Sequence, residues 1–254
     1  MIIKFSLGIE EKKSRIAAIR NTSSFHFKLF FVCVICFVQP ISGTETFAQE
    51  RDSTLWVVKP ADAIAPVSLA LAGFITRGKI SRHLQHSVER NYPDFQTKAD
   101  DYLPFLPVAV SLGLASSGVK GKHKLGDQII LALLSNVISQ GVTQSLKRII
   151  HYPRPQGERD YAFPSGHSTA AFTNATLLHE EYGQRSVYYS IGGYTTASAV
   201  GTMRVLNNKH WLADVLMGAG IGIGATKVLY ISYPWMQQTV RRIKHKKKST
   251  IEQE

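Results

Sequence analysis

A histidine and an aspartate stand four positions apart near the end of the chain, at His210 and Asp214, and Arg204 precedes them. Residues four apart share one face of a helix, so the carboxylate can hydrogen-bond one imidazole nitrogen. That bond fixes the tautomer and leaves the other nitrogen free to attack an electrophile. Taken alone, the pair is better explained as a stabilising contact on a helix surface. Its chemistry therefore depends on the residues that accompany it.

A second segment, Phe163–Ser168, reads FPSGHS and comes directly before an apolar stretch. Proline, serine and glycine in this position are typical of a helix start, where free backbone N–H groups bind anions. Gly166 allows close backbone approach, Ser165 adds a hydroxyl donor, and His167 lies at the mouth of the site. The alternative is an ordinary helix cap with an incidental histidine.

A third segment contributes cations: Lys147 near the end of a predicted helix, and Arg154 between two prolines. Arginine can grip two phosphate oxygens, whereas lysine supplies a point charge. Basic residues also stabilise helix C-termini through the helix dipole, and that explanation would suffice for this segment alone.

The elements that must position these residues are apolar segments separated by Gly- or Pro-marked breaks. Strand signals are weak, so we expect an all-α bundle. Alternate loops of such a bundle lie at the same end, which would bring the three segments together. The expected helices are 103–117, 129–150, 165–182, 187–203 and 211–233.

The joint pattern K-x6-R-P, P-S-G-H and R-x5-H-x3-D over Lys147–Asp214 resembles the type 2 phosphatidic acid phosphatase superfamily. One departure is Met203, where the family commonly has serine. His179–Gly183 together with Asn207–Trp211 resembles the bacterial envelope members described as lipid A phosphatases.

This resemblance implies a membrane-embedded helical bundle of about five to six helices and a phosphatase that forms a phosphohistidine. It makes His210 the nucleophile, Asp214 its orienting carboxylate and His167 the acid for the leaving oxygen. The remaining family positions hold the phosphate oxygens, and no metal or other cofactor is required; these positions are Lys147, Arg154, Ser165, Gly166 and Arg204.

The formal charge of +12 gathers at both chain ends, on either side of an apolar middle. This distribution favours an anionic bilayer as partner over nucleic acid. We expect a lipid phosphate as substrate and a bacterial inner membrane as location. The sequence does not choose among lipid A, undecaprenyl diphosphate, phosphatidate and phosphatidylglycerol phosphate.

Four regions are expected along the chain. Residues 1–48 form a signal peptide or N-terminal anchor, because the apolar run Leu29–Val38 is short for a span and precedes a small-residue cleavage pattern. Residues 49–101 are a periplasmic or interfacial region, 102–235 the phosphatase domain, and 236–254 a basic cytoplasmic tail. Both cysteines, Cys33 and Cys36, lie in the apolar run and are interpreted as filler.

Basic residues also predict the orientation. The tail and the loop with Lys120, Lys122 and Lys124 should lie in the cytoplasm, which places the site toward the periplasm. A cleaved signal then requires an odd number of crossings, and five are expected from Leu103 onward. Residues 60–75 would be peripheral or re-entrant unless the signal is retained.

Three alternatives stay open. A vanadate-dependent haloperoxidase shares the same anion cage, although such enzymes are usually larger and soluble. A soluble periplasmic acid phosphatase would agree with the mean hydropathy of −0.05. A membrane scaffold without activity is disfavoured, because unpaired ionisable groups in such a bundle are costly. The glycines in Gly218–Gly224 are interpreted as helix packing, since a nucleotide loop would need a preceding strand.

Overall fold

The computed structural model describes residues 60–157 and 161–251, which form helices and no strand, so the predicted all-α class is confirmed. The expected signal segment and both cysteines lie outside these residues. In chain order the elements are α2 (Pro60–Ile75), α3 (Lys79–Asn91), α4 (Ala99–Tyr102), the 3-10 turn η1 (Leu103–Phe105), α5 (Leu106–Ser116), α6 (Leu125–Ile150), α7 (Gly166–Tyr182), α8 (Val187–Leu206) and α9 (Leu212–Ile251).

Two helix boundaries differ from the sequence prediction in ways that affect function. Helix α8 continues to Leu206, which puts Arg204 in its last turn. Helix α9 begins at Leu212 and runs through Pro234 to Ile251 instead of ending at Tyr233. A single proline removes one hydrogen bond, and the basic residues that follow are good helix formers, so the helix continues.

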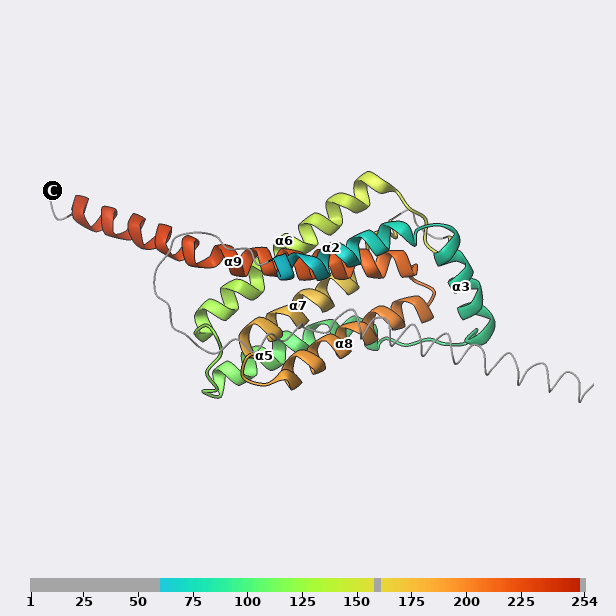
Figure 1. Ribbon diagram of the computed structural model, residues 1–254, viewed down its shortest axis with the longest axis horizontal. Helices are drawn as coiled ribbons and strands as arrows, with labels where there is room; N and C mark the ends of the chain where they lie inside the picture. The colour runs from blue at the N-terminus through green and yellow to red at the C-terminus, as the bar shows by residue number, and fades with distance from the viewer. Residues whose placement is uncertain (1–59, 158–160, 252–254) are drawn as a thin grey trace, which may run out of the picture.

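Helix α7 is the centre of the bundle and packs against α5, α6, α8 and α9. Every residue from Ser168 to Leu178 is buried. Figure 1 shows α7 enclosed by its neighbours while α2 lies along the other side of α9. The starts of α7 and α9 lie near one end of the molecule, where the Ser165 N–H donates to the Asp214 carbonyl oxygen at 2.9 Å.

The contact between α7 and α9 depends on glycines. A Cβ atom at Gly222 would lie 2.6 Å from the carbonyl oxygen of Thr169, and one at Gly218 would lie 2.6 Å from that of Ser165. On the opposite face of α9, a Cβ at Gly220 would lie 2.7 Å from the Pro66 carbonyl oxygen of α2. These are the close helix contacts that small residues permit in membranes, as the glycine spacing predicts.

The interface between α6 and α7 is rich in polar contacts. Thr143 and Thr169 hydrogen-bond at 3.0 Å, and the Thr173 hydroxyl donates to the Ser139 hydroxyl at 3.0 Å. The Asn136 side-chain amide donates to the side-chain oxygen Oδ1 of Asn174 at 2.8 Å. These side chains link α6 to α7 and are satisfied within the protein, as groups shielded from water must be.

The outside of α6 is the apolar face. Eight of its large apolar side chains are exposed: Leu125, Ile129, Ile130, Leu133, Val137, Ile138, Val142 and Ile149. An exposed apolar face on a helix whose opposite side makes polar contacts with α7 suits lipid surroundings.

By length and composition, two of the described helices can cross a membrane, α6 and the Leu212–Val240 part of α9. The pair Asp62–Ile75 and Lys79–Asn91 passes the same test together but is bent by 81°, as a broken span or a re-entrant loop would be. All five helices expected from Leu103 onward are present, but α5 is only 11 residues long and α7 carries many hydroxyls. The predicted number of five crossings stays a prediction.

The loops that carry the candidate site residues and the basic α5–α6 loop lie at opposite ends of the bundle. In Figure 1, the loops before α7 and α9 lie near α3 at one end, while the α5–α6 loop and the end of α9 lie at the other. The candidate site residues belong to the first end. The basic loop that contains Lys122, paired with Glu180 at 3.5 Å, belongs to the second.

Adding one methyl group at Gly222 should weaken the bundle. Gly222→Ala places a Cβ against the α7 backbone, where overpacking costs about 1–3 kcal/mol, so the thermal midpoint in detergent should fall by several degrees. Gly192→Ala on α8 is the matched control, because nothing lies within 4 Å of its Cβ position. Alanine is the better helix former, so this control should be neutral or stabilising. Equal midpoints for both variants would contradict the packing argument.

Candidate active site

His210 lies in the loop between α8 and α9 and is almost fully buried, with 2% of its surface exposed. Its Nδ1 is 3.1 Å from the Asp214 Oδ2, which also accepts the backbone N–H of Trp211 at 2.9 Å. The prediction that the two residues share one helix face is wrong, because His210 precedes the helix. Asp214 belongs to the first turn of α9, and its side chain reaches back to the preceding loop. The pairing is the one expected, and it commits Nδ1 to the carboxylate.

The start of α7 is fastened to the start of α9. The Ser165 backbone N–H donates to the carbonyl oxygen of Asp214 at 2.9 Å. Ser165 caps α7, and its Oγ accepts from the Ser168 N–H at 3.4 Å and hydroxyl at 3.0 Å. As acceptor in both bonds, the Ser165 hydroxyl keeps its own proton to donate. Gly166 follows, and its carbonyl accepts from Gln140 at 2.9 Å.

His167 is more open than His210, with 39% of its side chain exposed. Its Nε2 lies 3.1 Å from Oδ1 of Asp101, a residue of α4. The second imidazole is therefore near the surface of the site and paired with a different carboxylate from the first. A group that exchanges protons with a bound molecule needs this kind of access.

Three cations surround the loop between α8 and α9 that carries His210. Lys147 donates to the carbonyls of Tyr161 at 2.7 Å and Ala162 at 3.3 Å, which ties α6 to the segment before α7. The Arg154 turn is closed by the Gly157 N–H, and Trp211 holds the turn by donating to the Pro153 carbonyl at 2.7 Å.

The third cation, Arg204, lies in the last turn of α8 and is 4% exposed. Its carbonyl oxygen accepts the N–H groups of Lys209 and His210 at 3.1 and 3.2 Å, which closes the loop that carries the histidine.

The electrostatics show that these groups converge. Burial lowers the pKa of His210 well below its usual 6.5, and the charges of Lys147, Arg204, Arg154 and His167 lower it further. The imidazole is therefore neutral and carries a lone pair at neutral pH. Each sequence-predicted cation thus lies close enough to act on the same histidine, together with the helix start at Ser165 and Gly166.

Two residues of the site were not predicted, Asp100 and Asp101 on α4. Asp100 is fully buried and accepts from Arg204 Nη1 at 2.8 Å and from Asn207 at 3.0 Å. Burial alone would raise its pKa, but these hydrogen bonds and the charges of Arg204 and Lys209 outweigh burial and lower it. Asp100 is therefore a carboxylate that holds Arg204 in place.

Asp101 faces the site itself. Its Oδ1 is 3.1 Å from His167 and 3.6 Å from Arg204 Nη1, so one carboxylate oxygen touches two groups predicted to contact phosphate. His167 and Arg204 follow Asp101 by 66 and 103 positions, and residues 49–101 are expected from the sequence only as a periplasmic or interfacial region. The available signal is the charge count, because the three motif segments hold five Lys and Arg residues and a single carboxylate.

The donor chemistry of the site suits an anion. Within residues 60–157 and 161–251, no three His, Cys, Asp or Glu side chains are grouped so as to hold a metal ion. Cations, a helix start and a hydroxyl converge instead, and such groups stabilise phosphate oxygens directly.

The position of Asp101 predicts that it competes with an anion for the same cations. Asp101→Asn should tighten the binding of inorganic phosphate or orthovanadate several-fold, measured by isothermal titration in detergent. Asp94→Asn makes the same charge change at an exposed position outside the site and should leave the affinity unchanged. Weaker binding in Asp101→Asn would show instead that this carboxylate organises the cations for the anion.

Comparison with known proteins shows what these residues are similar to. Residues 128–238 match the model of the PAP2 superfamily. A lipid A 1-phosphatase of Porphyromonas gingivalis is 40% identical over 130 residues, which are 51% of this chain and 29% of that protein. The match thus spans less than a third of the curated relative.

Two solved structures are similar at lower identity. LpxE of Aquifex aeolicus has a TM-score of 0.47 and 19% identity, covering 61% of this chain and 96% of that chain. A transmembrane PAP2-type phosphatidylglycerolphosphate phosphatase of Bacillus subtilis has a TM-score of 0.48 and 21% identity, covering 65% of this chain and 94% of that one.

The predicted resemblance to the type 2 phosphatidic acid phosphatases is therefore confirmed over residues 128–238, a range that contains all three motif segments. The resemblance to lipid A phosphatases is confirmed by the curated relative. Together with the apolar helices, these matches identify a membrane protein.

Proposed function

We propose that this protein is a metal-independent phosphatase that hydrolyses a membrane lipid phosphate through a phosphohistidine intermediate. The observation that carries the proposal is the buried His210, whose Nδ1 lies 3.1 Å from Asp214 Oδ2 among three cations and the start of α7. A neutral imidazole with one nitrogen fixed by a carboxylate is an activated nucleophile. The surrounding cations stabilise the charge that develops on the phosphoryl oxygens.

In the first step, Nε2 of His210 attacks phosphorus and forms the P–N bond as the P–O ester bond breaks. His167 gives its proton to the leaving alkoxide oxygen, and Asp214 stabilises the positive charge on His210. The leaving oxygen must reach His167 Nε2, the atom that Asp101 contacts at 3.1 Å. Asp101 therefore has to yield that position when substrate enters.

In the second step, water attacks the phosphorus of phosphohistidine. His167, now neutral, takes a proton from this water as the P–N bond breaks, and inorganic phosphate leaves. The bonding electrons return to Nε2 of His210, so both histidines recover their starting states. Through both steps the phosphoryl oxygens are held by three cations and the start of α7, namely Lys147, Arg154, Arg204, Ser165 and Gly166.

A lipid is the substrate class favoured by the surroundings of the site. The relative from Porphyromonas gingivalis is a lipid A 1-phosphatase, and the exposed apolar face of α6 suits a bilayer. A phosphate at the membrane surface then lies at the level of the loops that carry the site. A small soluble phosphomonoester would gain nothing from this placement.

The proposed location is the bacterial inner membrane, with the site toward the periplasm and the Lys120–Lys124 loop in the cytoplasm. An alkaline phosphatase fusion after residue 158 should be active, because that enzyme folds only outside the cytoplasm, and a fusion after residue 248 should be inactive. The reverse pattern would overturn this orientation.

Phosphate release from a panel of lipid A, undecaprenyl diphosphate, phosphatidate and phosphatidylglycerol phosphate tests the function. We expect release to continue in EDTA and to stop with vanadate, which mimics the trigonal-bipyramidal phosphoryl group. His210→Ala should abolish both phosphoenzyme and turnover. His167→Ala should be slow on lipid substrates but much less impaired on an activated aryl phosphate, whose phenolate leaves without a proton.

Different outcomes would separate the parts of the proposal. Activity that EDTA removes and Mg²⁺ restores would contradict the metal-independent mechanism. An acid-labile phosphoenzyme that forms in His210→Ala but not in His167→Ala would reverse the two histidine roles. Bromide oxidation by the vanadate-loaded protein, with no phosphatase activity, would favour the haloperoxidase alternative.

A further inference from the structure

Arg77 lies at the bend between α2 and α3 and rests against two aromatic rings. Its guanidinium carbon is 4.4 Å from the centre of the Tyr152 ring and 5.3 Å from the centre of the Phe163 ring. A guanidinium at such a distance is attracted to the face of the ring. Tyr152 stands two residues before Arg154, and Phe163 stands two residues before Ser165. Arg77 therefore contacts two of the segments that bring phosphate-binding residues to the site.

The bend that carries Arg77 is fastened to the first turn of α9. The Ser81 hydroxyl oxygen accepts the backbone N–H of Ala213 at 3.2 Å. A Cβ atom at Gly73 would lie 2.9 Å from the Ala213 carbonyl oxygen, so α2 and α9 approach each other closely just before the bend. Ala213 directly precedes Asp214 in the chain. The position of Arg77 is thus fixed relative to the carboxylate of the candidate site.

The Asp214 carboxylate is fully buried, and its two oxygens have different surroundings. Oδ2 contacts Nδ1 of His210 and accepts the Trp211 N–H, whereas Oδ1 has no hydrogen-bond partner in the part of the chain that the structure describes. A buried carboxylate stays ionised only where nearby positive charge compensates for its lost hydration. The proposed mechanism requires this ionised form, because Asp214 stabilises the positive charge that develops on His210.

The cations that act on Asp214 differ in what else they do. They include Lys147, Arg77 and Arg154. Lys147 and Arg154 belong to the phosphate-binding set, so a bound phosphate dianion takes up much of their positive charge. Arg77 does not belong to this set, and it lies outside residues 128–238 that match the family model. Its charge therefore stays available to the carboxylate when substrate is bound.

We propose that Arg77 is a positioning residue of this site, which orders two phosphate-binding segments through Tyr152 and Phe163 and supplies Asp214 with a positive charge that the substrate does not neutralise. This role rests on the proposed phosphatase function and adds a fourth cation that does not hold the phosphate. Substitutions separate its two parts. Arg77→Lys keeps the charge but loses the planar group that stacks on the rings, whereas Arg77→Met loses the charge.

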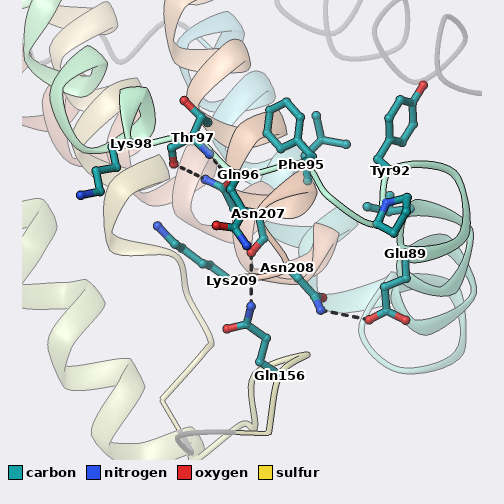
Figure 2. A pocket seen from close by; sticks show the side chains of 13 residues that line it. Glu89, Tyr92, Phe95, Gln96, Thr97, Lys98, Gln156, Asn207, Asn208 and Lys209 are labelled. Atoms are coloured by element: carbon teal, nitrogen blue, oxygen red, sulfur yellow. Dashed lines mark hydrogen bonds between the residues drawn. The ribbon is translucent and has the colours of Figure 1, made fainter.

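The loop before His210 has supports that do not involve Arg77, so the variants should keep it folded. Figure 2 shows these bonds. The Thr97 N–H donates to the Asn207 side-chain oxygen, and the Asn207 amide donates back to the Thr97 carbonyl oxygen, both at 2.9 Å. Gln156 donates to the Asn207 carbonyl oxygen at 3.5 Å. The effect of an Arg77 variant on activity therefore reports on the site and not on loss of the loop.

Steady-state kinetics on the panel lipid that the wild-type protein hydrolyses fastest tests the role. At neutral pH, Arg77→Met should lower kcat by roughly tenfold and change KM by less than about twofold, because Arg77 does not hold the phosphate. Arg77→Gln is a second uncharged variant and should behave in the same way. Arg82→Met removes the same charge at an exposed position of α3 and should match the wild-type protein.

The pH profile separates a charge effect from a purely structural one. Loss of a positive charge favours proton uptake by the His210–Asp214 pair, so the acid limb of kcat/KM should move up by about 0.5–1 pH unit in Arg77→Met. Arg77→Lys should keep the limb at its wild-type position. The other charged groups around the pair are unchanged in these variants; they are Lys147 of α6, Arg154 of the loop before α7, His167 of α7 and Arg204 of α8.

Histidine-selective NMR in detergent follows the same proton without turnover. The His210 resonance is assigned by its loss in His210→Ala, and its pH midpoint should rise in Arg77→Met but not in Arg77→Lys or Arg82→Met. An unmoved midpoint in Arg77→Met, an equal rise in Arg82→Met, or a raised KM with unchanged kcat would overturn the role of Arg77. If the midpoint moves but the wild-type protein hydrolyses no panel lipid, the phosphatase proposal fails and the action of Arg77 on the pair stands.

Discussion

The close contact of α7 with α9 is the constraint on which the rest of the molecule depends. Two glycines of α9 let the backbones approach until a methyl group would not fit, and the Ser165 N–H then reaches the Asp214 carbonyl at 2.9 Å. This single bond aligns the anion-binding start of α7 with the carboxylate that holds His210. If the two helices lay further apart, the imidazole and the helix start could not act on the same phosphate, even with every motif residue present.

Charge balance explains how so many cations can gather around a buried imidazole. Asp100 is fully buried yet ionised, because Arg204, Asn207 and Lys209 surround it. It neutralises part of the positive charge and fixes the direction of the Arg204 fork. Asp101 completes the acidic side at the entrance. The site is therefore a balanced arrangement in which α4, outside the matched family region, supplies the carboxylates that the motif segments lack.

The sequence allowed the residues of the phosphate motifs to be predicted, but not the carboxylates that hold those residues in position. The motif residues could be singled out because motif spacing is local and each helix end has recognisable residues. They are Lys147, Arg154, Ser165, His167, Arg204, His210 and Asp214. Asp100 and Asp101 could not, since their partners His167 and Arg204 lie 66 and 104 positions further along the chain and no local pattern reports such contacts. Helix ends are predicted within a few residues except at α9, where the expected end at residue 233 lies inside a helix that runs to Ile251.

The hydroxyl-rich surface of α7 also constrains how the chain can enter a membrane. Helices α6 and α9 are apolar enough to insert on their own account, whereas α7 has Thr169, Thr173 and Asn174 on faces that need partners. During synthesis α6 emerges before α7, and α9 emerges last. Ser139 and Thr143 of α6 are thus hydrogen-bond partners that are already synthesised when the hydroxyls of Thr173 and Thr169 emerge. A crossing by α7 would therefore require pairing with α6, and replacing Ser139 or Thr143 by an apolar residue would act on assembly before it acted on catalysis.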